Sequence, residues 1–271
     1  MQALLSSLPI ADVTAAILLI TIYAASATFS GFSGFGFPAI GSLTMVVLAP
    51  QLAIPLLISL SLATQALGSV ALWREFRDPT RRSLQRHGVA SGVGPYLIGG
   101  VSGLPLGLLL LSHAPAKLLM QVVGTVVVCY AVWSLLKPAA ALLHRTRQGP
   151  WSSLLVGAAG GVLGGCAAFP GLAVVIWTGL IGASKESSRS LTRSFILAMQ
   201  TIALSLLLIT HPHWFNVGFW TLFLLALPTT LLFFQLGVAI HRCTGDSSCR
   251  RITLIALGCA GLGLLFKSTL S

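Results

Sequence analysis

The chain has 271 residues, of which 55% are hydrophobic and only 8% are charged, and its mean hydropathy is +0.93. Soluble domains carry about 25% charged residues, so this composition excludes a soluble protein and predicts an integral membrane protein. The formal net charge of +11 does not indicate a nucleic-acid partner, because the basic residues lie in short loops between apolar segments, where membrane topology explains them. The five cysteines show no metal-binding spacing, and neither a metal nor a cofactor is expected.

Apolar segments of about 20 residues predict transmembrane helices. The N-terminal segment has no basic region, so a cleaved signal peptide is not expected. Two apolar regions, 13–49 and 152–182, are too long for one crossing. The first contains "FSGFGFP" at 32–38 and the second contains "CAAFPG" at 166–171, whose glycines and prolines predict helix breaks. The predicted single crossings are 52–73, 88–111, 116–136, 194–210, 214–240 and 252–266.

Basic residues gather in four of the loops, which hold 14 of the 16 Lys and Arg residues. Basic loops face the cytoplasm, so residues 74–87, 137–151, 183–193 and 241–251 are predicted to lie inside. Residues 152–182 separate two loops on the same side and must therefore enter the membrane and return. We expect a re-entrant hairpin or a pair of short helices, with "CAAFPG" at the tip.

Similar features recur at a nearly constant separation along the chain. Phe37-Pro38 and Phe169-Pro170 are 132 residues apart, and Gly124 and Gly258 are 134 apart. The charge bias of equivalent loops reverses between the two halves, which indicates opposite orientations in the membrane. We therefore predict an all-α polytopic membrane protein with two inverted repeats, 1–137 and 151–271. Each comprises a broken or re-entrant hairpin and three transmembrane helices, and residues 138–150 form a cytoplasmic connector.

The two broken stretches resemble the paired motifs of the TauE/SafE sulfite exporter family. "FSGFSGFGFPAIG" resembles the first-half motif, and "GGVLGGCAAFPGLAVVIW" followed by "KESSRSLTR" resembles the second. The resemblance covers essentially the whole chain and implies a multi-pass transporter of sulfite, sulfonates or related organosulfur anions. This chain departs from the glycine-richer family pattern at Phe35, Phe37 and Cys166-Ala167-Ala168, which implies a narrower site.

The candidate site lies at the two hairpin tips and on the helices that follow them. The glycines either allow close helix packing or present backbone amides to an anion, and the serines either donate to an oxyanion or bond back to their own helix. The glutamines either line a cavity or join helices. Arg193, expected to open the helix after the second hairpin, is either one more cytoplasmic cation or a substrate ligand. Phe35 and Phe37 are predicted gates. The predicted substrate-binding residues are Ser30, Gly31, Ser33, Gly34, Gly36, Pro38, Gln65, Gly164, Gly165, Cys166, Phe169, Pro170, Arg193 and Gln200.

Broken helices in inverted repeats are typical of secondary transporters. The predicted function is alternating-access transport of a small anion across the bacterial cytoplasmic (inner) membrane, with that anion and the lipid bilayer as partners. An anion channel and a carrier of another carboxylate-type anion are the alternatives, and a homodimer stays open. A membrane enzyme is not expected, because no His or acidic residue falls deep within a predicted span.

Overall fold

The computed structural model describes residues 13–34, 36–76, 93–136, 149–183 and 185–243, and part of the segment 255–269. Every regular element among these residues is helical, as predicted. Six of the helices are long and apolar enough to cross a bilayer, which confirms a multi-pass membrane protein. In chain order the elements are α2 (Val13–Ser33), α3 (Phe37–Gly41), the 3-10 helix η1 (Ser42–Val46), α4 (Pro50–Phe76), α5 (Gly94–His113), α6 (Ala116–Leu136), α7 (Pro150–Ala167), α8 (Gly171–Leu180), α9 (Lys185–Thr210), the 3-10 helix η3 (Pro212–Trp214) and α10 (Val217–Cys243).

Both predicted helix breaks are confirmed. The first separates α2 from α3 and the second separates α7 from α8. Pro38 lies in the first turn of α3, and Pro170 is the N-cap of α8, positions at which a missing backbone N–H costs little. The arms on either side of each break are unequal. Helices α2 and α7 are long enough to span a bilayer, whereas α8 has 10 residues and reaches only about 15 Å.

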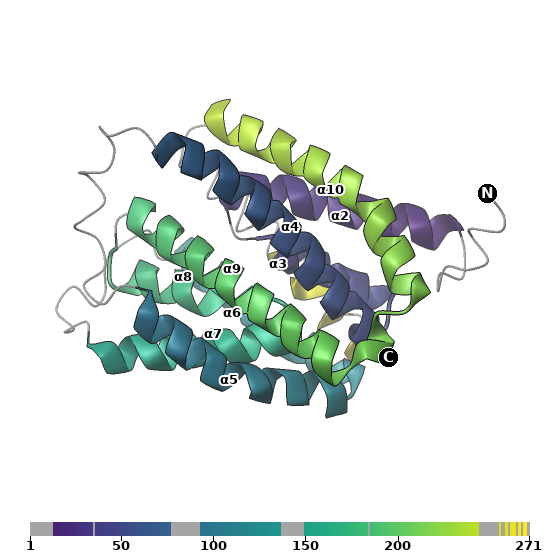
Figure 1. Cartoon of the computed structure of the whole chain (residues 1–271), viewed down its shortest axis with the longest axis horizontal. Coiled ribbons are helices and arrows are strands. Elements are labelled where there is room, and N and C mark those ends of the chain that lie inside the picture. Colours follow the sequence, from purple (N-terminus) through teal and green to yellow (C-terminus); the bar gives the residue numbers. More distant parts are fainter. Residues whose placement is uncertain are drawn as a thin grey trace.

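Helices α4 and α9 form the centre of the bundle (Figure 1). Helices α2 and α10 pack together on one side of this centre, and α5 and α7 pack together on the other. The apolar segment of α4 is the most buried of the six, at 67%, and that of α10 is the least buried, at 22%. The glutamines of the two central helices, Gln65 of α4 and Gln200 of α9, are both buried and so face protein instead of lipid.

Helices α5 and α7 run parallel in backbone-to-backbone contact. A Cβ atom on Gly99 would meet Leu154, one on Gly103 would meet Ala158, and one on Gly107 would meet Val162. The residue numbers of the contacting pairs increase together along both helices, so α5 and α7 run in the same direction. Small residues four apart allow this approach, and α7 contributes its own set, Gly157, Gly161 and Gly165.

Helices α2 and α10 make a similar but less continuous contact. Gly31 lies against the backbone of Phe234 and Val238, and Gly237 lies against the backbone of Thr28. An apolar groove of about 670 Å³ that is open to the surface runs beside this contact, and its lining extends from Ile20 to Phe32 on α2 and from Thr229 to Ile240 on α10. The first hairpin therefore makes fewer glycine contacts with the backbone of its partner helix than the second does.

The predicted start of the helix after the second break is wrong. Helix α9 begins at Lys185, so Arg193 lies about two turns inside it instead of opening it. The segment from 185 to 189 is too polar to be counted as part of the membrane span, which begins at Ser190. However, Lys, Glu and Arg are good helix formers, and they extend the apolar helix backwards.

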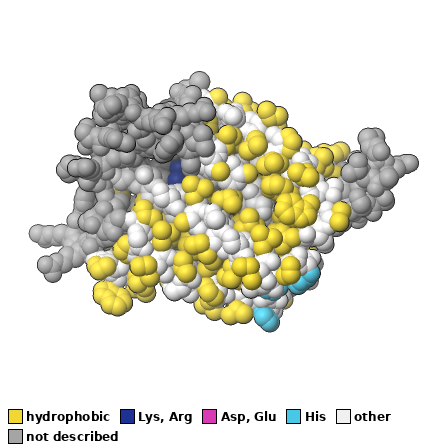
Figure 2. Space-filling view, in the orientation of Figure 1, with side chains coloured by type: hydrophobic (Ala, Val, Ile, Leu, Met, Phe, Trp, Pro, Cys, Tyr) yellow, Lys and Arg dark blue, Asp and Glu magenta, His cyan; other side chains and the backbone are white. Residues whose placement is uncertain are grey.

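The outer surface suits a bilayer. Figure 2 shows a face covered largely by hydrophobic side chains, with histidines at one end. Large apolar side chains such as Ile17, Ile209 and Leu224 are more than half exposed, as expected of residues that contact lipid. His211 stacks on Trp214 at 4.4 Å between ring centroids in the loop that joins α9 to α10, an arrangement that suits the membrane interface.

Candidate functional site

The first break is closed by its own hydrogen bonds. Gly34 has φ +87°, and its N–H donates to the carbonyl of Ser30 at 2.7 Å. The hydroxyl of Ser33 donates to the carbonyl of Phe29 at 2.8 Å and accepts from the N–H of Gly36 at 3.1 Å. In this conformation the amides of Gly34 and Gly36 are engaged inside the break, so an anion there would have to replace these bonds.

The second break has an equivalent capping structure. Ala168 adopts the left-handed conformation at φ +58°, and its N–H donates to the carbonyl of Gly164 at 3.1 Å. The N–H of Phe169 donates to the carbonyl of Leu163 at 3.2 Å. These two bonds satisfy carbonyls at the end of α7. A side chain on Gly164 would press on Pro170, so the glycine lets the chain turn closely back on itself.

Backbone strain at Ala168 leads to a first prediction. An L-residue other than glycine pays about 1–2 kcal/mol in the left-handed region, so Ala168→Gly is expected to raise the free energy of unfolding by about 1 kcal/mol. The neighbouring change Ala167→Gly, at a helical position of equal burial, is expected to lower it by about 1 kcal/mol. Thermal unfolding of the purified variants in detergent measures both. If both variants change the free energy of unfolding in the same direction, the backbone at Ala168 is not strained.

Buried polar side chains of α4 and α9 join these two helices to each other and to the first break. Gln65 Nε2 donates to the carbonyl of Gly34 at 3.2 Å and so ties α4 to the first break. Gln200 Nε2 donates to Ser61 Oγ at 2.9 Å and joins α9 to α4. Both glutamines are at most 2% exposed. The structure thus brings one predicted glutamine against a predicted tip, while the other contacts the centre of α4.

Several buried polar atoms in the described part of the chain have no hydrogen-bond partner within the protein. They include Ser30 Oγ, Gln200 Oε1, Thr192 Oγ1 and Tyr23 Oη. Leaving such an atom unpaired costs about 1–3 kcal/mol, and buried polar groups are usually satisfied by protein or water. Two of these four residues, Ser30 and Gln200, are predicted substrate ligands.

Arg193 is 8% exposed and lies in the first turn of the apolar part of α9, Ser190–Thr210. Among the Lys and Arg side chains whose burial the structure describes, it alone is buried; Lys117 is exposed. A buried guanidinium in a membrane span is costly and marks a functional position more often than a topological one.

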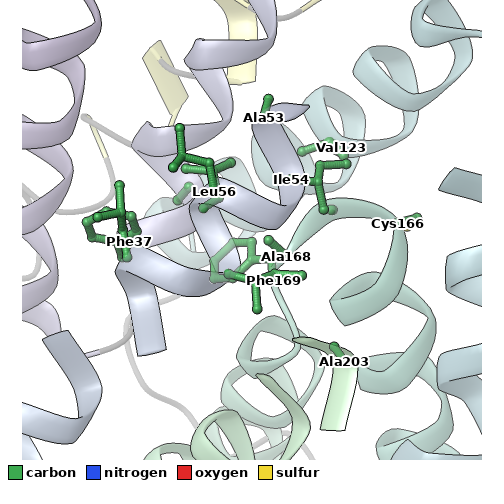
Figure 3. Close-up of a cluster of buried hydrophobic side chains, with 14 of the residues drawn as sticks. Phe37, Ala53, Ile54, Leu56, Val123, Cys166, Ala168, Phe169 and Ala203 are labelled. Carbon is green, nitrogen blue, oxygen red and sulfur yellow. The ribbon is translucent and has the colours of Figure 1, made fainter. Parts of the chain in front are cut away.

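The aromatic residues Phe37 and Phe169 of the two breaks belong to the same buried hydrophobic core. Figure 3 shows Phe37 and Phe169 among buried hydrophobic side chains that include Ile54 and Leu56 of α4. Phe37 is fully buried and Phe169 is 2% exposed. The predicted gate Phe35 lies outside the described residues.

The remaining tip residues are packed. A side chain on Gly31 would meet the backbone of α10, and one on Gly165 would meet the backbone of α5, which favours the close-packing role for both. Pro38 and Cys166 are buried. Sequence reasoning did not single out Tyr23, Ser61 or Thr192. Their signal was a polar residue in an apolar helix, which by itself does not say whether it faces lipid or protein.

Comparisons with known proteins give one match. The family model described as Sulfite exporter TauE/SafE matches residues 17–264. No curated protein and no solved structure matches the chain.

Proposed function

The chain belongs to the sulfite exporter TauE/SafE family of membrane transporters, and from this premise we propose that it carries sulfite, a sulfonate or a related organosulfur anion across the bacterial cytoplasmic membrane. The observation that carries the proposal is a pair of buried, unpartnered polar atoms, Ser30 Oγ next to the first break and Gln200 Oε1 on α9. Buried polar groups in a membrane protein face a cavity or one another, and these two have no hydrogen-bond partner in the part of the chain that the structure describes.

The polar groups suit an oxyanion. Ser30 offers a hydroxyl donor. The hydroxyl of Ser61 can accept from the Gln200 amide or donate to it, and the two amide orientations are not distinguished by heavy-atom positions. If Ser61 donates to the amide oxygen, the –NH₂ group of Gln200 becomes free to bind an anion. Arg193 supplies a cation, and an arginine binds an oxyanion through two parallel hydrogen bonds.

The closed aromatic cluster supports an alternating-access mechanism. Phe37 and Phe169 come from opposite breaks and lie in the same buried cluster, so we assign them the role of closing the site in this conformation. Transport would then require the two hairpins to separate alternately toward each side of the membrane. A permanently open pore would not need this closure.

Equivalent glycine contacts support two inverted repeats. Gly31 on α2 approaches the backbone of α10 at Phe234, and Gly161 on α7 approaches the backbone of α5 at Gly100. These pairs are related by separations of 130 and 134 residues, close to those of the sequence motifs. Each hairpin would therefore pack on a helix of the other half, as a twofold relation between residues 1–137 and 151–271 requires.

Flux into proteoliposomes tests the function. We expect saturable uptake of radiolabelled sulfite that is competed by sulfonates, with empty liposomes as the control. A membrane potential that is negative inside favours efflux of a monovalent anion by about 2.3 kcal/mol per 100 mV, so imposing this potential should slow uptake. The proposal fails if sulfite, sulfonates and carboxylates all remain outside. Conductance far above carrier turnover would indicate a channel.

A further inference from the structure

Helix α2 carries a buried polar stripe along the face that points into the bundle. Tyr23, Ser26 and Ser30 lie at spacings of three and four residues and therefore share one face of the helix. All three are at most 1% exposed, whereas Ile17 and Leu18 of the same helix are exposed to the surroundings. The stripe leads from the middle of α2 to the first break.

Tyr23 is the unusual member of this stripe. Ser26 Oγ donates to the carbonyl of Ile22 at 2.6 Å, so its hydroxyl is satisfied within the helix. Tyr23 is 1% exposed, and its hydroxyl oxygen has no hydrogen-bond partner among the residues that the structure describes. A buried tyrosine hydroxyl normally finds a partner, because an unpaired polar group in an apolar environment is costly.

A second hydroxyl faces Tyr23 from η1. Thr44 is fully buried, and its hydroxyl interacts with that of Tyr23 without reaching hydrogen-bond geometry. The Thr44 hydroxyl donates instead to the carbonyl of Gly41 at 2.8 Å. Two neutral hydroxyls thus lie near each other in the first hairpin, and among the described residues that of Tyr23 has no partner at full hydrogen-bond geometry.

The distance along the helix separates this place from the site between the breaks. Seven residues of α-helix correspond to about 10 Å, so Tyr23 and Ser30 are too far apart to hold one small oxyanion together. They are close enough to be two successive positions on one route. Neutral donors suit such a route, because binding along it must be weak enough for the ion to leave.

We propose that the hydroxyl of Tyr23, faced by Thr44, forms a second binding position for the transported oxyanion, on the side of the first break where α2 begins. This inference rests on the proposed function and adds to it a position and a residue outside the two breaks. The ligand is the oxyanion itself, which accepts the Tyr23 O–H. A permanently bound water in the same place is the outcome that would exclude it.

Tyr23→Phe tests the proposal, since it removes the hydroxyl and keeps the ring. A hydrogen bond to a charged group corresponds to a factor of about ten or more in binding, so the sulfite concentration for half-maximal flux should rise about tenfold. The melting temperature without sulfite should stay the same or rise, because an unsatisfied hydroxyl is removed. The stabilisation of the protein by added sulfite should shrink.

Tyr96→Phe is the matched control. Tyr96 is as buried as Tyr23 but does not leave a buried, unpartnered hydroxyl, and its variant should transport sulfite as the wild type does. If the Tyr23→Phe protein does not accumulate, Thr44→Val tests the same position and should also raise the sulfite concentration for half-maximal flux.

The outcomes separate this inference from the proposed function. Suppose that the wild type transports sulfite, and that the sulfite concentration for half-maximal flux in Tyr23→Phe is within twofold of the wild-type value. This result overturns the second binding position alone and leaves a bound water as the explanation. A lower melting temperature with unchanged half-saturation also overturns it, because the hydroxyl is then structural. Absence of wild-type flux overturns the proposed function, and this inference with it.

Discussion

Replacing Gly103 by alanine should prevent the transporter from folding stably in the membrane. The added Cβ would meet the backbone carbonyl of Ala158 on α7, and a backbone atom cannot move aside as a flexible side chain can. The two helices would have to separate along their contact, at a cost of about 3 kcal/mol. Fluorescence-detected size-exclusion chromatography and thermal unfolding in detergent measure the loss.

Gly94→Ala is the matched control for this change. It lies in the same helix, and a Cβ there would meet nothing within 4 Å. We expect the Gly94→Ala protein to elute and melt as the wild type does. If Gly103→Ala also behaves as wild type, helices α5 and α7 are not in backbone contact in the membrane.

Replacing Arg193 by glutamine should reduce transport at least tenfold and leave the fold intact. Arg193 is buried at the start of the apolar part of α9, and a hydrogen bond from a cation to an anion contributes about 1.5–3 kcal/mol. Arg193→Lys should retain part of the activity, since lysine keeps the charge but loses the paired geometry. Initial rates of sulfite flux in proteoliposomes measure the effect.

The control for Arg193 is Lys117→Gln. Lys117 is an exposed basic residue near the start of α6, and its loss should leave flux unchanged. Equal flux in wild type and Arg193→Gln would show that Arg193 serves only the orientation of the chain in the membrane. Lower flux in both variants to the same degree would indicate a general effect of surface charge.

The sequence predicted the breaks well because their cause is local. Glycine and proline act on the backbone within a turn of their own position, and α2 and α7 end where "FSGFGFP" and "CAAFPG" occur. The unequal arms and the early start of α9 were not predicted. Hydropathy indicates where a chain enters the apolar part of the bilayer, and a helix can continue beyond that point through a polar stretch such as residues 185–189.

The candidate site was harder to predict because its contacts join distant parts of the chain. The bond from Gln200 to Ser61 spans 139 residues, and no local pattern indicates it. The role of a glycine also depends on what lies next to it in the folded protein. Gly31 and Gly165 occur in motifs that could form a ligand-binding tip, but they lie against the backbones of α10 and α5. Tyr23 could be recognised only once its burial was known.

The pairing of α2 with α10 has a consequence for biosynthesis. The intervening segment, residues 34–216, is 183 residues long. At about 5–20 residues per second the ribosome needs roughly 10–40 s to supply the partner of the first hairpin. During that interval the face of α2 that carries Gly31 must rest against lipid or an insertion factor. Truncated chains that end before α10 should therefore be good substrates for membrane quality-control proteases.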